Sequence, residues 1–412
     1  MATLTSAFSR GAQVLLLAAR PRLSEEAERR LHARLRGGPD WERVLALARR
    51  HRVAALLHRR LSVAPFAAAV PSGVLERLHT RLRKNAVRGL LQERDLVRVL
   101  TVLEEAGIRA LPFKGAVLGE RVYGNVALRP FGDLDIVVPA EAFSHARRLL
   151  CEEGFRPLNE MDAQEEATYF RREKSYELVR GDTIVELHWS FLHPMHGVAL
   201  DFASVWDRAQ EMPLGDASAR VMTPEDLVLY LCAHGGKHFW ERLSWICDVA
   251  ESLHVYRDAL HWPTLLERAR TLHVERMLLM GLQLAGDLLG ARGPSAAARA
   301  RPGDAAVDAL SAHVHERLFR ERTAPQSDLT AEDIRFHLKM RERLRDRLPY
   351  YRQLARLAVE PTPRDRDWVE LRPSWHFAYY ALRPVRLLCE GLDRLLTSAS
   401  GAPEEHPSMR RK

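Results

Sequence analysis

Hydrophobic residues recur every three or four positions in the N-terminal part of the chain, which is the period of a helix that buries one face. The stripe from Trp41 to Ala48 follows Asp40, a residue type that caps helix N-termini. A helix is likewise predicted from Ser24 to Leu35, because the run Gly37 to Pro39 breaks the pattern. A third helix is predicted to begin near Pro71.

Between residues 91 and 215 the pattern changes, and strands are predicted to alternate with helices. Short apolar runs and runs of helical period predict, in this order, a strand at 108–113, a helix at 116–123, a strand at 133–138 and a helix at 140–153. Two more strand-like runs between 175 and 189 flank Gly181-Asp182, a two-residue loop typical of hairpins.

After this segment the pattern again predicts helices. Thr223 suits a helix N-cap and Pro224 the first helical position. Residues 291–305 are rich in Ala, Arg, Gly and Pro and are predicted to form a linker, with helices resuming near Ala331. The polar segment 396–412 is predicted to be a disordered tail.

We therefore predict an α+β fold. A small mixed β-sheet core at residues 91–215 is expected between an N-terminal helical region at 1–90 and a C-terminal helical region at 216–395. The tail at 396–412 follows.

Composition places the chain among globular proteins. Hydrophobic residues make up 46% and charged residues 28% of the 412, which excludes a wholly disordered or fibrous protein. No apolar run approaches the roughly 18 residues of a membrane span, so no membrane partner is expected, and Val14 to Ala19 is predicted to be helical rather than part of a signal peptide. The four cysteines form neither a metal pattern nor a disulfide framework, which indicates a reducing, cytoplasmic location.

The net charge of +8 would suit an anionic ligand such as a nucleotide or RNA. However, the Lys and Arg residues are spread through predicted helices, with no dense basic block interleaved with aromatic residues. Solvated helix faces are therefore the favoured interpretation, and a nucleic-acid partner is an alternative that is not favoured.

Two aspartates, Asp133 and Asp135, alternate with apolar residues along a predicted strand. Alternate residues of a strand face the same side, so both carboxylates project together, about 7 Å apart, while Leu134 and Ile136 face the core. Such a pair is repulsive unless a cation lies between the two, and hard oxygen ligands favour Mg²⁺ or Mn²⁺ over zinc. The alternative is an exposed strand face with two solvated acids.

A third acid, Glu186, lies in the second hairpin strand between Val185 and Leu187. A carboxylate in so apolar a strand is costly unless it has a partner. If this strand lies beside the Asp133–Ile136 strand, the three acids complete a metal site of the type used for two-metal phosphoryl transfer. We therefore predict that Asp133, Asp135 and Glu186 are catalytic and bind the metal. Glu186 is also the candidate general base, and His188 shares its side of the strand.

Further motifs extend this pattern along the chain: Phe113–Ala116, Arg121–Gly124, Leu128–Asp135, Val185–Trp189, His234–His238, Trp245–Ala250 and Tyr379–Pro384. In these motifs the chain resembles the bacterial family of uncharacterised nucleotidyltransferases, from about Asp40 to Leu388. The resemblance implies a mixed-sheet nucleotidyltransferase core. It also implies transfer of a nucleoside monophosphate from a nucleoside triphosphate (NTP) to a hydroxyl acceptor, with Mg²⁺ or Mn²⁺ as cofactor.

The sequence departs from the superfamily pattern at the phosphate-binding turn. Where that pattern has a glycine-serine turn, this chain has Lys114-Gly115, and the 18 residues from Gly115 to Asp133 are a long separation. We therefore predict that Lys114, the Gly115 backbone and Arg129 contact the phosphates. The alternatives are a surface lysine at a strand end and, for Arg129, an ion pair that pins its loop.

His234, Lys237 and His238 are spaced to share one helix face. Lys237 is predicted to bind the nucleotide, and His234 and His238, like His188, are predicted to contact the substrate. The alternatives are helix packing and, because two histidines lie four residues apart, zinc binding, although the sequence shows no third ligand. Asp248 lies among apolar residues and is expected to form a structural ion pair with Arg242 or Lys237.

The first functional hypothesis is metal-dependent transfer of a nucleoside monophosphate to an unidentified hydroxyl acceptor, which is a small molecule, a peptide or a protein. The second is a non-catalytic nucleotide-binding or scaffold protein that retains the fold. The third is modification of RNA ends, with tRNA as acceptor, for which the sequence shows little clustering of charge. Arg383 and Arg386, near Tyr379, are expected to pack between helices rather than to contact an anionic acceptor.

Overall fold

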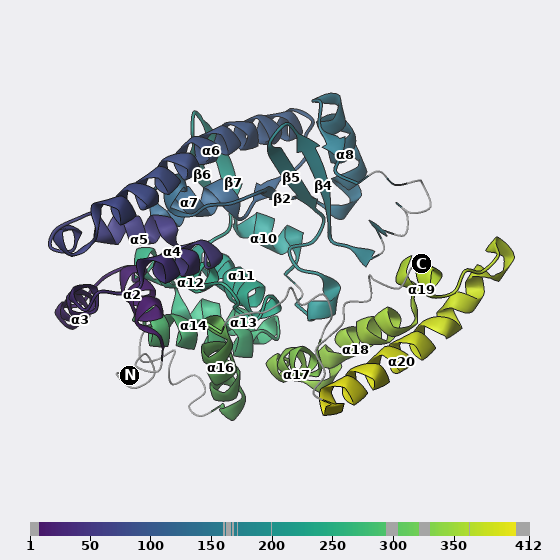
Figure 1. Cartoon of the computed structure of the whole chain (residues 1–412). Coiled ribbons are helices and arrows are strands. Elements are labelled where there is room, and N and C mark those ends of the chain that lie inside the picture. Colours follow the sequence, from purple (N-terminus) through teal and green to yellow (C-terminus); the bar gives the residue numbers. More distant parts are fainter. Residues whose placement is uncertain are drawn as a thin grey trace. The chain divides into compact units, whose positions relative to one another are not determined.

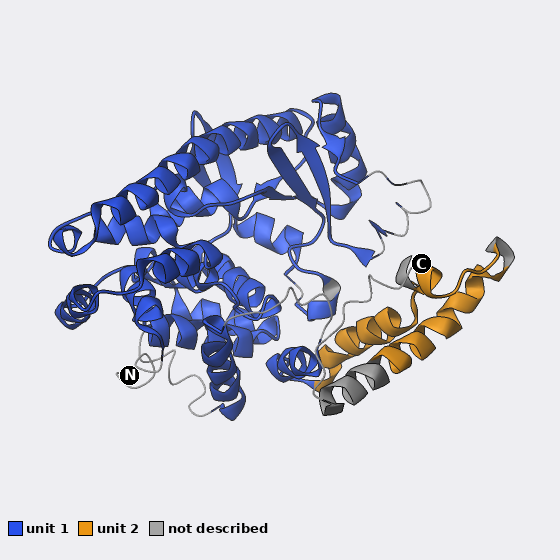
Figure 2. Cartoon of the chain, viewed as in Figure 1, with its two compact units in different colours: residues 1–343 blue, residues 344–412 orange. Residues whose placement is uncertain are grey.

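The computed structural model of the chain describes residues 8–159, 161, 166, 169–170, 172–198, 200–293, 304–320, 330–361 and 363–400. It divides into two compact units, residues 1–343 and residues 344–412 (Figure 2). The sheet and the candidate site belong to the first unit.

The N-terminal helices of the first unit are α2 (Arg10–Ala18), α3 (Glu25–Arg36), α4 (Trp41–Arg50), α5 (Ala54–Leu61) and α6 (Ser72–Glu105). The predicted caps are confirmed: the Ser24 hydroxyl accepts the Ala27 N–H at 3.3 Å, and the Asp40 carboxylate accepts the Arg43 N–H at 3.0 Å. Helix α6 begins where the sequence predicted a helix, but it continues unbroken through residues 90 and 91, so the expected domain boundary there falls inside a helix.

Five strands form the main sheet: β1 (Leu111–Pro112), β2 (Leu134–Val137), β3 (Arg156–Pro157), β4 (Ser175–Arg180) and β5 (Thr183–His188). Their order is β1-β2-β5-β4-β3, in which β2 and β5 are parallel and the other pairs are antiparallel. The predicted hairpin around Gly181 is confirmed, and β5 lies beside β2, which is the condition set for a three-acid site, so the fold is α+β with a small mixed sheet. Strand β1 is shorter than the predicted 108–113 run, because only Leu111 and Pro112 pair with β2.

Helices pack on this sheet through their apolar positions. Helix α7 (Gly115–Tyr123) follows β1 and leads to the loop before β2, and this loop contains the 3₁₀ turn η2 (Val126–Leu128). After β2 come the 3₁₀ turn η3 (Ala140–Ala142) and helix α8 (Phe143–Glu152). One core contains Leu96, Val99 and Leu103 of α6, Phe143, Ala146 and Leu150 of α8, and Leu134, Ile136, Val185 and Leu187 of the strands. Burial of each large side chain stabilises the fold by about 1.5–3 kcal/mol. Because side chains alternate along a strand, the polar residues of β2 and β5 lie on the opposite side of the sheet from this core.

A second, two-stranded sheet was not anticipated. Strands β6 (Gln210–Leu214) and β7 (Ala217–Val221) follow η4 (Pro194–His196) and α10 (Phe202–Arg208) and turn at Gly215, whose φ is +56°. The sequence does contain a loop signal here, Gly215-Asp216, of the same kind as Gly181-Asp182. The strands themselves were missed because five of their ten residues are exposed and Val221 is their one β-branched residue.

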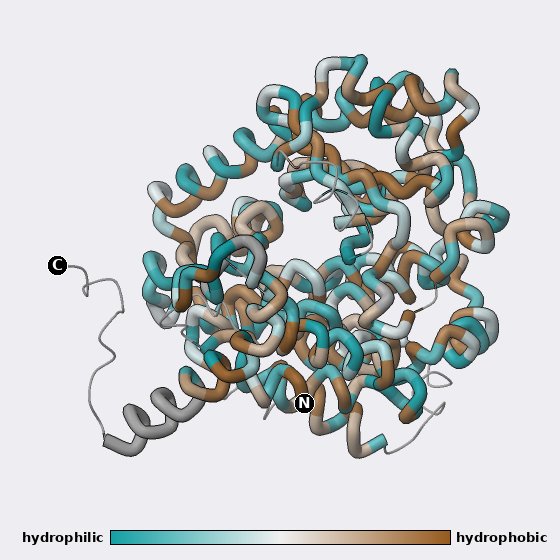
Figure 3. The backbone as a smooth tube through the Cα atoms, turned by 90° about the vertical axis from the view of Figure 1, so that its right-hand side faces the viewer, coloured by the Kyte–Doolittle hydropathy of each residue, from teal (hydrophilic) through white to brown (hydrophobic). Residues whose placement is uncertain are grey.

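The remaining helices of the first unit are α11 (Pro224–Lys237), α12 (Leu243–Val255), α13 (Trp262–Thr271), α14 (Glu275–Leu289), α16 (Ala305–Leu318) and α17 (Ala331–Met340). Thr223 caps α11 as predicted, since its hydroxyl accepts the Asp226 N–H at 3.3 Å. These helices share one apolar core with α2–α5. Figure 1 shows them gathered below the sheet, and Figure 3 shows hydrophobic and hydrophilic segments alternating along the helices, as expected for helices that bury one face. Of the predicted linker, 294–303 lies outside the described residues.

The second unit contains α18 (Leu344–Val359), α19 (Pro363–Trp368), the 3₁₀ helix η5 (Pro373–Ala378) and α20 (Tyr379–Ser400). Arg383 and Arg386 both pair with Asp365, at 3.1 and 2.6 Å, so they join α20 to α19, as the packing interpretation expected. Helix α20 runs to Ser400, past the expected boundary at 395, and the rest of the predicted tail, 401–412, lies outside the described residues. None of the helices in the described chain combines the length and the apolar character that crossing a membrane requires.

Candidate active site

A pocket of about 440 Å³ lies where β2 and β5 meet the loop before β2 and the helices α7, α11 and α12. Its lining includes every predicted site residue except His188: Lys114, Gly115, Arg129, Asp133, Asp135, Glu186, His234, Lys237 and His238. Residues that are more than one hundred positions apart in the sequence therefore share one cavity.

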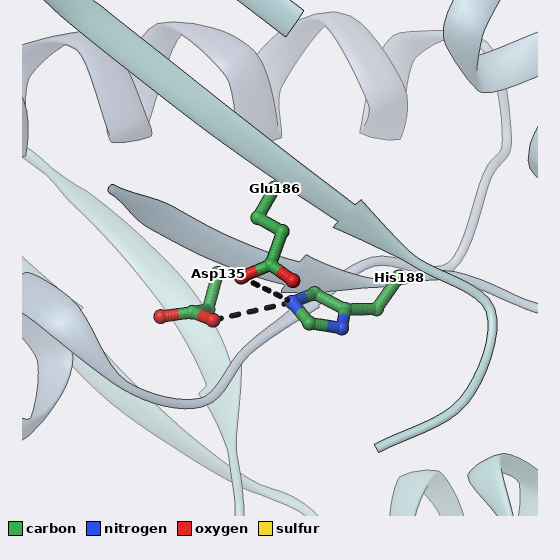
Figure 4. A group of neighbouring side chains, drawn as sticks. All are labelled: Asp135, Glu186 and His188. Carbon is green, nitrogen blue, oxygen red and sulfur yellow. Dashed lines mark hydrogen bonds and ion pairs between the residues drawn. The ribbon is translucent and has the colours of Figure 1, made fainter. Parts of the chain in front are cut away.

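The acidic side of the pocket is built from the register of β2 and β5. Asp135 and Glu186 are Cα partners in this parallel pair, and Asp133 precedes β2 on the same side as Asp135. Figure 4 shows the Asp135 and Glu186 carboxylates pointing toward each other, and one ligand atom from each of Asp135, Glu186 and His188 lies within 4.8 Å of the others. The three predicted carboxylates thus line one cavity, while the group of close ligand atoms contains Asp135 and Glu186 with His188 and not Asp133.

His188 lies behind these carboxylates and is fully buried. Its Nε2 is 3.1 Å from Asp135 Oδ1 and 3.4 Å from Glu186 Oε2 (Figure 4), and its Nδ1 is 3.0 Å from Lys174 Nζ. An ammonium group can only donate a hydrogen bond, so Nδ1 accepts and the ring proton is on Nε2, facing the two carboxylates. The imidazole therefore holds the acids in place from the protein side, and it is not on the pocket surface where a substrate would contact it.

Two lysines neutralise the acids. Lys114 Nζ forms an ion pair with Asp135, and Lys174 Nζ lies 3.4 Å from Glu186 Oε1, which also accepts the Ser175 hydroxyl at 2.6 Å. Lys114 occupies the N-cap position of α7, and the next residue, Gly115, has φ +54°. A Cβ at Gly115 would also lie 3.3 Å from the Asp133 carbonyl oxygen, so the turn that presents Lys114 to the acids needs glycine.

These contacts separate the pKa values of the acids. Burial alone raises the pKa of Glu186 and of Asp135, but His188 and the lysines outweigh it and lower both pKa values below their ordinary range. Burial and the charge of Asp135 raise the pKa of Asp133. Glu186 is therefore held as an anion, which suits cation binding and disfavours the general-base role that the sequence suggested for it.

The rest of the pocket is mostly basic. Six cationic side chains line it, against four carboxylates, and these six are Arg52, Lys114, Arg129, Lys174, Lys237 and Arg242. Burial and the charges of Lys174 and Lys114 lower the pKa of Lys237 to about 8. A pocket with this excess of positive charge favours a polyanionic ligand such as a triphosphate.

The two histidines of α11 have neutral rings. Burial, with the charge of Lys237, lowers the pKa of His238 to about 3, and the pKa of His234 is also lowered well below its usual range, again by burial first. The His238 ring stacks on Trp245 with centroids 4.9 Å apart. Within the described chain, the one group with metal-ligand geometry contains neither histidine, so the zinc alternative gains no support.

Arg129 is anchored by Asp248 of α12. Its guanidinium donates two hydrogen bonds to that carboxylate, at 2.9 and 3.0 Å, and the Tyr123 hydroxyl donates a third at 2.7 Å. The prediction that Asp248 pairs with Arg242 or Lys237 is therefore wrong, because the loop that contains η2 brings Arg129 against α12 instead. Arg129 also lines the pocket, so its ion pair and its predicted contact with phosphate are compatible.

Sequence reasoning missed Lys174, Ser175, Tyr123 and Tyr230. Lys174 lies directly before β4, and the register of Ser175 with His188 brings it to the acids. Tyr230 lines the pocket one helical turn before His234, with its hydroxyl 3.4 Å from His234 Nδ1. The spacing of Tyr230 and His234 was a usable signal, whereas nothing local in the sequence singles out Lys174.

Comparisons with known proteins identify a family for the chain. A family model described as "Uncharacterised nucleotidyltransferase" matches residues 37–290, and so does not extend to the Tyr379–Pro384 run. Among solved structures, the chain is similar to the crystal structure of ANT(2")-Ia in complex with adenylyl-2"-tobramycin, at 12% identity over 44% of this chain and 97% of that one, with a TM-score of 0.32. It is also similar to an antigenic nucleotidyltransferase-like protein from Paracoccidioides brasiliensis, at 14% identity over 51% and 95% of the two chains, with a TM-score of 0.30. No curated protein matches the chain.

Proposed function

Because the chain belongs to the family of uncharacterised nucleotidyltransferases, we propose that it transfers a nucleoside monophosphate from an NTP to a hydroxyl group of an acceptor, with Mg²⁺ or Mn²⁺ bound. Family membership accounts for nucleotidyl transfer in general. The observation that carries the finer proposal is that Asp133, Asp135 and Glu186 line one pocket together with six cationic side chains. In such a pocket the carboxylates can bind a metal ion, while the Lys and Arg side chains can bind a polyphosphate beside it.

The donor set fits a hard divalent cation. Asp133, Asp135 and Glu186 would hold it through carboxylate oxygens, which Mg²⁺ and Mn²⁺ prefer. When bound, the cation neutralises charge on the phosphates and makes the acceptor hydroxyl a better nucleophile. His188 acts from behind, where its Nε2 proton orients Asp135 and Glu186.

In the proposed reaction the acceptor oxygen attacks the α-phosphorus of the NTP. The bond from that phosphorus to the oxygen that bridges to the β-phosphate breaks, pyrophosphate leaves with the bonding electrons, and the hydroxyl proton is released to a base or to water. Lys114 and Lys237 lie on the pocket wall and stabilise the negative charge of the phosphates. Arg129, held by Asp248, is pre-oriented for the same task.

One observation favours nucleotide binding without turnover as the second candidate. Lys114 and Lys174 pair with Asp135 and Glu186, so protein cations alone neutralise these acids. A protein of this kind would bind an NTP through the basic wall without needing a metal. Transfer requires instead that a divalent cation compete with these lysines for the carboxylates.

The proposal is tested by labelling. We expect purified protein, incubated with each labelled NTP, Mg²⁺ or Mn²⁺ and a cell extract, to transfer label to one class of molecule and to release pyrophosphate. Omitting the divalent cation removes the label if the reaction is metal-dependent. Metal-independent NTP binding with no labelled product under any condition contradicts transfer and supports the non-catalytic alternative.

Lys237 predicts a pH dependence of NTP binding. Since the pKa of Lys237 is about 8, its ammonium is charged at pH 7 and loses its proton as the pH rises through 8. We therefore expect NTP affinity to fall about three- to tenfold between about pH 7 and pH 9, measured by calorimetry with Mg²⁺ present. Lys237→Met binds weakly throughout, and Lys237→Arg, which stays protonated, retains affinity at the higher pH. A wild-type profile as flat as that of Lys237→Arg contradicts the assignment.

A further inference from the structure

A second cavity of about 340 Å³ adjoins the candidate active site. It is bounded by α4, α5, α6, η2 and the loop before β2, and five cationic side chains line it: Arg49, Arg52, Arg81, Lys84 and Arg88. No acidic residue is among its lining residues. We call this cavity the basic pocket.

None of the ion pairs within the described residues includes Arg49, Arg52, Arg81, Lys84 or Arg88, although the negative charge of Asp133 acts on Arg52. Among the described residues, the side-chain hydrogen bond that these five cations form is from Arg88 Nη2 to the Gly132 carbonyl oxygen, at 3.3 Å. By contrast, Arg77, which like Arg88 is on α6, is paired with Glu42. All five residues are exposed, so water and salt screen the repulsion between them, and a multiply charged anion in the cavity would interact with several of them at once.

Arg52 is the cation at which the basic pocket meets the candidate active site. Its backbone has φ +57°, an uncommon conformation for a residue with a side chain, and it lines both the basic pocket and the candidate active site. Burial and the charges of Arg242, Arg129 and Arg88 lower its pKa. A guanidinium held near three others is a typical arrangement at a site for a multiply charged anion.

The basic pocket adjoins the candidate active site through shared lining residues. The two cavities share Arg52, Pro130 and Phe131, and the carbonyl oxygen of the following residue, Gly132, accepts hydrogen bonds from Arg88 and from Gln92 Nε2, the latter at 3.2 Å. The next residue in the chain is Asp133. A ligand in the basic pocket would therefore lie on the loop that carries the first catalytic aspartate.

We propose that the basic pocket binds the acceptor and that the acceptor is a phosphate-bearing molecule; this inference rests on the proposed transfer reaction. In-line displacement puts the acceptor and the leaving pyrophosphate on opposite sides of the α-phosphorus, so the acceptor needs a site of its own beside the one that holds the triphosphate. Four of the five cations are arginines, whose planar guanidinium matches phosphate oxygens in pairs. A single carboxylate group on an acceptor would be neutralised by one cation, whereas five cations and no acid line this cavity.

Two sources of phosphate fit this chemistry, a small phosphorylated molecule and the backbone of RNA. A further cavity of about 450 Å³ shares Arg49, Arg81 and Lys84 with the basic pocket and continues along α4 and α6. Beyond the shared residues this cavity adds Arg77, which is paired with Glu42, and the acid Glu76, so it does not by itself favour RNA over a small phosphorylated molecule. The experiment below separates the two sources.

The test uses the full-length double variant Arg81→Glu/Lys84→Glu, which leaves the candidate active site intact. The matched control is Arg83→Glu/Arg94→Glu, because these residues are on the same helix, are exposed, line neither cavity and change the net charge equally. The probes are a fluorescein-labelled, 5′-phosphorylated RNA of about twelve nucleotides, followed by anisotropy, and fructose 1,6-bisphosphate as competitor. NTP binding is measured separately by calorimetry, and circular dichroism verifies that each variant is folded.

We expect the Arg81→Glu/Lys84→Glu variant to bind the RNA probe at least about tenfold more weakly and with a shallower salt dependence, while the control stays within about twofold of the wild type. Displacement of the probe by the sugar bisphosphate supports a small phosphorylated acceptor, and displacement only by unlabelled RNA supports an RNA acceptor. Absence of wild-type binding to either probe, or equal loss in both double variants, overturns the inference.

Failure of the proposed transfer gives a different result. In that case the RNA or bisphosphate still binds through Arg81 and Lys84, but no labelled product forms with any NTP, and the basic pocket is not an acceptor site. If the Arg81→Glu/Lys84→Glu variant instead loses NTP affinity as strongly as probe affinity, the basic pocket belongs to the triphosphate site and the acceptor assignment is overturned.

Discussion

Replacing Asp133 with asparagine is expected to lower the rate of nucleotidyl transfer by about a thousandfold without lowering the stability of the protein. Asp133 lines the pocket beside Asp135, and in the described chain it belongs to no ion pair, so the change removes a proposed metal ligand and breaks no salt bridge. Burial and the Asp135 charge raise its pKa, which means that the charged form destabilises the fold at neutral pH. An uncharged asparagine removes that cost.

The measurement combines label transfer with thermal unfolding. Asp135→Asn should also lose transfer, but because it leaves Lys114 buried without its partner, its melting temperature should fall, whereas that of Asp133→Asn should stay the same or rise. Glu177→Gln is the matched control, since Glu177 is the Cα partner of Glu186 on β4 and does not line the pocket. Near-normal transfer by Asp133→Asn would remove this aspartate from the catalytic site.

Breaking the Arg129–Asp248 pair should have the largest effect on stability. Asp248 is 1% exposed and accepts three hydrogen bonds, two from Arg129 and one from Tyr123. Asp248→Ala leaves a buried guanidinium without a counter-charge, so we expect the free energy of unfolding to fall by about 3–5 kcal/mol in urea titrations. Arg242→Ala, at the arginine that the sequence proposed as the partner, should change it by less than about 1 kcal/mol.

The double variant Arg129→Ala/Asp248→Ala separates the two roles of Arg129. If the pair is structural, the double variant should be more stable than Asp248→Ala alone, because no unpaired charge remains. If Arg129 also contacts phosphate, transfer by the double variant should stay low although stability returns. An Asp248→Ala protein with wild-type stability would show that Arg129 finds another partner, and the anchoring role would be wrong.

The local elements of the fold followed from the sequence because they depend on neighbours in the chain. The caps at Ser24, Asp40 and Thr223 are formed by hydroxyl or carboxylate groups that reach a backbone N–H three residues away. The hairpin at Gly181 follows from a two-residue turn and alternating apolar positions. The same alternation assigned Asp133 and Asp135 to one side of a strand before any partner strand was known.

The pairing of the Glu186 strand with β2 could not be predicted from the sequence and entered only as a condition for the three-acid site. The register of Asp135 with Glu186 is a contact between residues 51 positions apart, and pairing at that distance depends on which apolar faces pack together. For the same reason Lys174, which touches the acids from a strand end, carries no local signal.

The helix caps, the apolar side of each strand and the three candidate acids could all be predicted from the sequence alone. Each of these features is specified by residues a few positions apart. Only the tertiary structure decided that Arg129 rather than Arg242 holds Asp248, and that scattered cations of α4 and α6 meet in one basic pocket. Along the chain those cations look like solvated helix faces, spread over two helices. They become a single cluster because the apolar faces of the helices fix how they pack, and packing sets the positions of charges that sequence spacing leaves free.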